Sequence, residues 1–250
     1  MRMVLLTALG IGGATIIGAA IGFCVKNVSH KINDMILSFA AGIMLAAAVG
    51  GLIAPAFELV NGIQLLIPVT GIFAGALFLN FMDKVTPHLH KIAGTDEEAH
   101  VNNKNLSRAL LFVMAVAIHN LPEGMAAGVS FGNEDVSAAI TVAVGIALQN
   151  IPEGIVTVSP LVMSGVSRGR AFILAAATGF IEVAGCFLGF FVANVSTVIL
   201  PFALAFAGGT MLYIISDEMI PETHSHGYER ISTYSLLVGV TLMLVMDVVL

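Results

Sequence analysis

Long apolar segments separated by short polar ones dominate the pattern of hydrophobic and polar positions along this chain. About 20 apolar residues are needed to cross a bilayer, and the pattern contains eight segments of that kind. They lie at 3–25, 33–60, 65–83, 106–130, 136–162, 169–194, 198–222 and 231–250. The first apolar run is longer than the core of a cleavable signal peptide, which favours a retained helix. The sequence therefore predicts an all-α integral membrane protein with eight transmembrane helices.

The composition supports a membrane environment for the whole chain. The 250 residues are 58% hydrophobic and 10% charged, and the 26 glycines suggest closely packed helices. Roughly 25% of residues are charged in a soluble domain, so this chain has too few to coat a water-facing surface. We expect residues 1–250 to form a single transmembrane domain in contact with the lipid bilayer. The net charge of −6 suggests no nucleic-acid partner, and the glycine- and alanine-rich helix faces permit a homodimer.

Basic residues are distributed unequally between the two ends of the predicted helices. Nine of the ten Lys and Arg residues would fall on one side of the membrane, and only Arg2 on the other. An excess of Lys and Arg marks the cytoplasmic side. We therefore predict a multi-pass protein of the cell membrane with both termini outside the cytoplasm. The segment 84–105 would form a cytosolic loop that contains several histidines and acidic residues.

Three carboxylates fall in the middle of predicted spans: Glu123, Glu153 and Glu182. A carboxylate at the bilayer centre costs about 2.5–3.5 kcal/mol, and no Lys or Arg lies in mid-helix to pair with these groups. Cations would supply the missing positive charge most simply. One divalent ion would leave a net negative charge on the three carboxylates, and two would leave a net positive charge. Both one and two bound ions therefore remain possible.

The sequence HNLPEG at 119–124 places donor side chains on one face of the fourth predicted helix. His119 and Glu123 are four residues apart and share a face, and Asn120 borders the same arc. Pro122 has no N–H group, so a backbone carbonyl one turn earlier loses its helical partner and the helix is expected to kink there. Unsatisfied backbone at membrane depth is tolerated where it lines a polar cavity.

The sequence QNIPEG at 149–154 repeats this design in the fifth helix, with Gln149, Asn150 and Glu153. A lone intramembrane carboxylate is explained as well by a hydrogen bond to a neighbouring helix, but the duplication favours a site for divalent metal. Imidazole, carboxylate and amide groups without thiolate suit zinc, ferrous iron, manganese or cadmium better than calcium or cuprous copper. The metal would be a substrate, and no prosthetic group is expected.

These motifs resemble those of the ZIP family of divalent-metal transporters and, within it, the bacterial GufA-like branch. HNLPEG and QNIPEG are similar to the family's fourth- and fifth-helix signatures, and Glu182 in FIEVAG resembles its sixth-helix metal carboxylate. The sequence YIISDEMIPETH at 213–224 resembles the end of its seventh helix. The resemblance implies inverted repeats of helices 1–3 and 6–8 around a kinked pair of helices 4 and 5.

The resemblance also implies two neighbouring metal sites. The first combines an imidazole, an amide and two carboxylates: His119, Gln149, Glu123 and Glu153. The second combines two amides and three carboxylates: Asn120, Asn150, Glu123, Glu153 and Glu182. Met44 resembles an additional thioether ligand of this branch, and core packing is the alternative role for it. Many members have His in place of Gln149 and some have Asp in place of Asn150, so the second site has one charge fewer here.

The function that the resemblance implies is transport of divalent metal ions, zinc first, into the cytoplasm. A metal-selective channel or a metal-sensing membrane receptor could use the same ligands and remains an alternative. Asp217 and Glu218 could form an exit site, and the 84–105 loop could collect or release metal, although solvated side chains are the simpler explanation for both. The sequence GVSFG at 128–132 matches G-x-S-x-G of hydrolases but lacks a strand–turn–helix context. An enzyme is not expected.

Overall fold

The computed structural model describes residues 1–25, 29–92, 104–132, 135–163, 165–195 and 199–249, and within these ranges all regular structure is helical. The α-helices are α1 (Arg2–Cys24), α2 (His30–Ala46), α3 (Ala54–Glu58), α4 (Leu66–Ile92), α6 (Lys104–Ser130), α7 (Val136–Met163), α8 (Arg168–Val195), α9 (Leu200–Ile214), α10 (Ile220–Thr223) and α11 (Glu229–Val249). Two π-helical segments, η1 (Ala47–Ile53) and η3 (Ile215–Met219), join α2 to α3 and α9 to α10. A short 3-10 segment, η2 (Gly62–Leu65), precedes α4.

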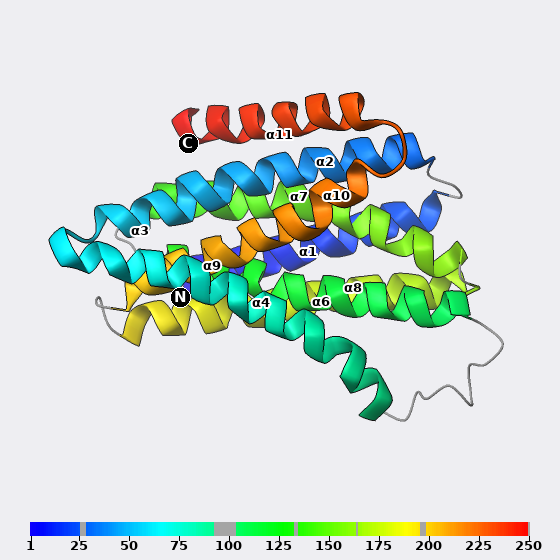
Figure 1. The fold of residues 1–250 in the computed structure, drawn as a ribbon, viewed down its shortest axis with the longest axis horizontal. Helices are drawn as coiled ribbons and strands as arrows, with labels where there is room; N and C mark the ends of the chain where they lie inside the picture. Colours follow the sequence, from blue (N-terminus) through cyan, green and yellow to red (C-terminus); the bar gives the residue numbers. More distant parts are fainter. Residues whose placement is uncertain (26–28, 93–103, 133–134, 164, 196–198, 250) are drawn as a thin grey trace.

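The helices are long enough to cross a membrane many times. Seven stretches of the described chain have the length and apolar composition of a membrane span. The eighth expected span is α6, a helix of 27 residues that continues through Pro122. Successive spans run in opposite directions, and the two termini lie toward the same end of the molecule (Figure 1). The prediction of an all-α, multi-pass membrane protein is confirmed.

The third span differs from its predicted bounds. We expected it to end at residue 83, but α4 continues to Ile92, so the predicted 84–105 loop is helical at both of its ends. Hydropathy marks where side chains leave the hydrocarbon, whereas helical backbone hydrogen bonds persist outside it. Residues 93–103 lie outside the described part of the chain, as do the side chains of His88 and His90. The predicted role of these histidines and acidic residues stays a prediction.

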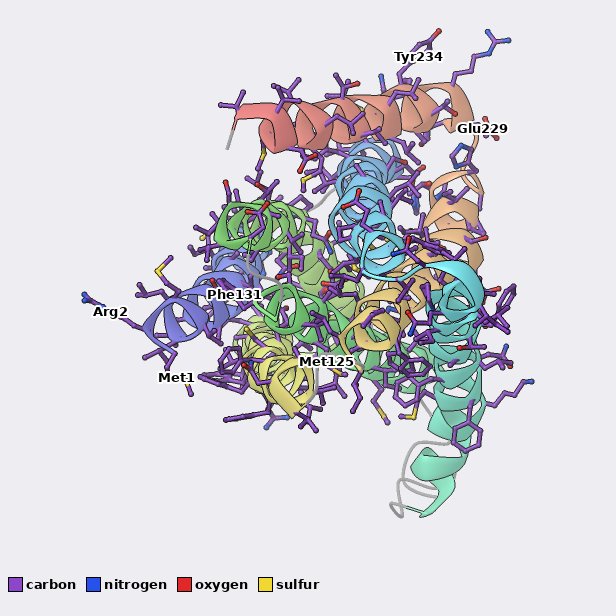
Figure 2. The ribbon with its side chains drawn as sticks, turned by 90° about the vertical axis from the view of Figure 1, so that its left-hand side faces the viewer. Met1, Arg2, Met125, Phe131, Glu229 and Tyr234 are labelled. Atoms are coloured by element: carbon purple, nitrogen blue, oxygen red, sulfur yellow. The ribbon has the colours of Figure 1, made fainter. Side chains whose placement is uncertain are left out.

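The spans form two groups, which Figure 2 shows in a view along the helices. In the first group α6 packs on α8, α1 packs on α7, and α1 also packs on α8. In the second group α4 packs on α9, and α2 packs on α11. The groups meet mainly where α2 contacts α7 and where α9 contacts α6. Helix α11 lies at the outer edge, and the exposed side chain of Tyr234 points away from the other helices (Figure 2).

The pattern of neighbours confirms the inverted repeat. Exchanging α1 with α8, α2 with α9, α4 with α11 and α6 with α7 converts each helix pair named above into itself or into another of those pairs. The π-helical segments occupy equivalent places, since η1 follows the second span's α2 and η3 follows the seventh span's α9. Each is followed by a short helix with a proline near its start, Pro55 in α3 and Pro221 in α10.

Glycines let the helices of the first group approach closely, and they do so in equivalent pairs. A Cβ atom at Gly124 would strike the backbone carbonyl of Glu182, and one at Gly154 would strike that of Thr15. Such backbone contact is typical of membrane helices that meet through small residues. Thr15 in α1 and Glu182 in α8 therefore hold equivalent positions in the two repeats.

The two repeats also touch each other directly through glycines. A Cβ atom at Gly12 in α1 would collide with the carbonyl oxygen of Gly179 in α8, and one at Gly179 would collide with that of Gly12. The contact is therefore between the same position of each repeat. It brings α1 and α8 together beside the two motif helices.

Candidate metal site

The two motifs lie in the middle of α6 and α7. These two helices are consecutive in the chain and run antiparallel. Helix α7 begins after Asp135, whose side-chain Oδ1 accepts the backbone N–H of Ala138 at 3.1 Å. This is the usual way in which an aspartate satisfies the first turn of a helix. Because Gly124 and Gly154 permit backbone contact with α8 and α1, the motif residues face a centre shared by four helices.

Glu182 of α8 is the centre of a buried hydrogen-bond network. Its Oε1 accepts the hydroxyl of Thr15 at 2.6 Å and the amide Nδ2 of Asn120 at 2.5 Å. Its Oε2 accepts the amide Nδ2 of Asn150 at 2.5 Å. The amide of Asn150 also lies 3.2 Å from the backbone carbonyl of Ile11 in α1. Three other helices are thereby connected to one carboxylate.

Next to this network lies a set of polar atoms that are buried without a hydrogen-bond partner in the described part of the chain. It contains both carboxylate oxygens of Glu123, both side-chain polar atoms of Gln149, and Oδ1 of Asn120 and of Asn150. The side chain of Gln149 is a neighbour of Glu123 within this cluster. A buried polar group left in this way costs about 1–3 kcal/mol. Such a cluster calls for an ion, water or ligand.

His119 lies at a more accessible edge of the site. Its Nε2 is 2.8 Å from a carboxylate oxygen of Glu218, which belongs to η3 and has a side chain 34% exposed. Glu153 is partly exposed and neighbours both of these groups. Glu218, which the sequence suggested as part of a separate exit site, therefore joins the edge of the motif cluster. Asp217 is exposed and shows no such contact among the described interactions.

Not all predicted ligands come together. Met44 is buried among apolar residues of α1, α2, α6, α7 and α9, and its role as a ligand stays a prediction. Among the side chains that the structure describes, no three from His, Cys, Asp and Glu converge closely enough to hold a metal ion. The arrangement instead combines one buried carboxylate, Glu123, with the neighbouring amide of Gln149.

Two residues of the site were not predicted in these roles, namely Thr15 as a partner of Glu182 and Glu218 as a partner of His119. Thr15 lies in an apolar helix with no local motif, so its neighbourhood in sequence contains no signal. Comparison of the repeats would have found it, because Thr15 and Glu182 occupy equivalent positions next to equivalent glycines. Glu218 was noticed for its charge, but its partner lies on another helix.

The hydrolase-like sequence GVSFG has no geometry suited to a nucleophile. Ser130 is buried at the end of α6, and its hydroxyl donates to the carbonyl of Ala127 at 2.8 Å. A nucleophile elbow needs a strand before the turn, whereas the residues described around this motif are helical or in a turn.

Comparison with known proteins agrees with this geometry. The family description "ZIP Zinc transporter" matches residues 94–247. Similar proteins include the zinc transporter GufA of Myxococcus xanthus, which is 40% identical over 97% of each chain. The zinc transporter ZIPB of Bordetella bronchiseptica is 35% identical over 95% of this chain and 78% of its own. The zinc transporter ZupT of Chlorobaculum parvum is 34% identical, covering 94% and 92%. The chain belongs to the ZIP family, in its bacterial GufA-like branch.

Proposed function

We propose that this chain transports divalent metal ions, zinc first among them, across the membrane and into the cytoplasm. The observation that carries the proposal is the Glu123 carboxylate, which is buried at the meeting point of the motif helices with both oxygens unpartnered in the described structure. A cation is the simplest group that stabilises such a carboxylate inside a membrane. The names of the similar proteins support zinc as its identity.

The donor set supports a site that a metal can enter and leave. Carboxylate, imidazole and amide groups bind zinc and similar ions, and without thiolates they bind them less permanently than structural zinc sites do. The ion would be coordinated by Glu123 together with His119, Gln149 and Glu153, while the Asn120 and Asn150 oxygens lie on the same helix faces. His119 would leave Glu218 in order to bind the metal, which makes Glu218 a candidate for receiving the ion afterwards.

The positions of the basic residues support inward transport. Lys31, Arg168 and Arg230 lie near the first residues of α2, α8 and α11, all at the end of the molecule opposite to the termini (Figure 1). By the positive-inside rule this end faces the cytoplasm, and the termini face outward. Helix α9 begins at the opposite end, so Glu218, which follows it, lies toward the cytoplasmic side of the motif cluster.

Zinc uptake into proteoliposomes tests the proposal. Wild-type protein is expected to give saturable uptake, and Glu123→Gln is expected to abolish it while the protein remains folded. Glu229→Gln, an exposed residue at the start of α11 on the far edge of the molecule (Figure 2), is the matched control and should behave as wild type. Uptake that fails to saturate would favour a channel. Zinc binding without uptake would favour a receptor.

A further inference from the structure

The surroundings of Glu182 differ from those expected of a metal ligand. Its two oxygens face an O–H group and two N–H groups that come from α1, α6 and α7, all of them buried. A cation that approached these oxygens would have to displace at least one donor, and the freed hydroxyl or amide would then need a new partner in the membrane interior. Glu182 is thus already compensated by neutral groups of the protein.

The same hydrogen bonds fix the orientation of both asparagines. An amide that faces a carboxylate must present its NH₂ group, because a carboxylate and an amide oxygen would repel each other. The Oδ1 atoms of Asn120 and Asn150 consequently point away from Glu182, and both are buried without a partner in the described structure. They belong to the helix faces that carry Glu123 and Glu153, so Glu182 prepares two oxygen donors on the side of the remaining carboxylates.

The charge of the site supports the same division of roles. The hydroxyl and the two amides stabilise the charge of Glu182 without a cation beside it. The two motif carboxylates, Glu123 and Glu153, lack such a set of donors and together carry a charge of −2. One divalent ion balances this charge. Asn150 is decisive here, since an aspartate in its place would confront Glu182 with a second carboxylate, and this like-charged pair would favour a second cation between the two groups.

We infer that Glu182 is a positioning residue that orients the amides of Asn120 and Asn150, and that the transport site of this chain holds a single divalent ion. The inference rests on the proposed function for the identity of the ligand as a transported metal. Its two parts are separable from transport itself, because the number of bound ions and the groups that bind them can be measured without flux.

The number of ions is tested by equilibrium dialysis of the purified full-length protein against zinc, with elemental analysis. Other surface histidines can bind zinc, so the content of Glu123→Gln is subtracted from that of each protein. The expected difference is one zinc for the wild type and two for Asn150→Asp. A difference of two for the wild type, or no gain in Asn150→Asp, overturns the inference. Absence of zinc uptake by the wild type would instead contradict the proposed function.

The role of Glu182 is tested by infrared difference spectra recorded on zinc addition. If Glu182 only positions the amides, Glu182→Gln retains the zinc-induced carboxylate bands of the wild type, whereas loss of one of those bands identifies it as a ligand and overturns the inference. Thr15→Val, which removes one donor, should raise the KM for zinc uptake roughly tenfold. Thr15→Ser keeps the hydroxyl and should restore the wild-type KM. An unchanged KM in Thr15→Val contradicts the role of the network.

Discussion

The two inverted repeats have the same backbone design but different chemistry at the metal site. In the C-terminal repeat, η3 carries Glu218, which contacts His119 on α6. Gly51 in η1 holds the equivalent position of the N-terminal repeat, where a Cβ atom would meet the side chain of Val142 rather than a polar group. The motif residue equivalent to His119 is Gln149. One edge of the site is therefore ionisable, and the corresponding edge is neutral and apolar.

A similar difference occurs at the centre. Thr15 and Glu182 occupy equivalent positions, yet one donates a hydrogen bond and the other accepts it. A fully symmetric sequence would place two carboxylates against each other, which repel when ionised, or two hydroxyls, of which only one could donate to the other. The comparison teaches that backbone packing follows the symmetry of the repeats, whereas the polar contacts depend on departures from it.

The largest expected effect comes from comparing the two motif glutamates. Glu123 is fully buried, whereas Glu153 is partly exposed. We expect Glu123→Gln to lower zinc uptake by more than about 100-fold, because removing a metal ligand exceeds the 10- to 100-fold loss typical of a supporting residue. Glu153→Gln should cause a smaller loss, since water can replace an accessible carboxylate. Uptake kinetics in proteoliposomes measure both, and equal losses would contradict the distinction.

Exchanging the first residues of the motifs tests the asymmetry of the site. His119→Gln should lower zinc uptake by about 10- to 100-fold, less than the loss for Glu123→Gln, because glutamine keeps a neutral oxygen donor at a position where the imidazole was also neutral. Adding Gln149→His should not restore it, because the new imidazole would lie on the side of Gly51 and away from Glu218. Uptake by the single and double variants measures the effect. Full recovery in the double variant would show that the two halves are interchangeable.

Substitution of equivalent glycines tests the symmetry of the backbone. A Cβ atom at Gly18 would strike the carbonyl of Ile151, and one at Gly185 would strike that of Leu121. We expect each change to alanine to reduce stability by a similar amount, about 1–3 kcal/mol, because the helices must move apart. Gly10→Ala is the control, since no atom lies within 4 Å of its added Cβ. Thermal unfolding in detergent measures all three, and unequal losses would weaken the equivalence.

The smallest effect is expected at the ionisable edge. Glu218→Gln removes a partly exposed partner of His119, and we expect roughly a threefold change in uptake, in keeping with the modest worth of an accessible ion pair.

Uptake by the wild type should fall as the pH drops toward about 5, because protons compete with metal for imidazole and carboxylate ligands. Initial rates across this pH range provide the measurement. Uptake that increases with acidity in both proteins would contradict the assigned ligands.

Much of the fold could be predicted from the sequence because membrane insertion imposes a strong rule on it. Apolar length predicted the spans, and the duplicated motifs predicted which two helices carry polar faces. Local rules failed at contacts between distant residues. Asp34 lies close to the start of a predicted span, where an aspartate would be expected to face the interface, yet it is fully buried and its Oδ1 lies 3.1 Å from Nδ1 of His226. Its partner belongs to the α10–α11 connection, which no pattern around Asp34 indicates.

The site shows the same limit. Spacing predicted that His119 and Glu123 share a helix face, but it could not predict that Glu182 would accept hydrogen bonds from both asparagines. Such contacts depend on how closely α8 approaches α6 and α7, and that distance is set by glycines on several helices. The end of α4 was also misplaced, because apolar length predicts the membrane boundary rather than the end of a helix.

The contact between Gly12 and Gly179 has a consequence for how this protein can evolve. Most core contacts join two side chains, so a larger residue on one helix can be offset by a smaller one on the other. Here each glycine meets a backbone carbonyl. A substitution on the other helix cannot remove that carbonyl or make it smaller. Neither position has a compensating partner, so both are expected to stay glycine in related sequences without co-varying with any other site. Methods that infer contacts from correlated substitutions would therefore overlook this contact between the two repeats.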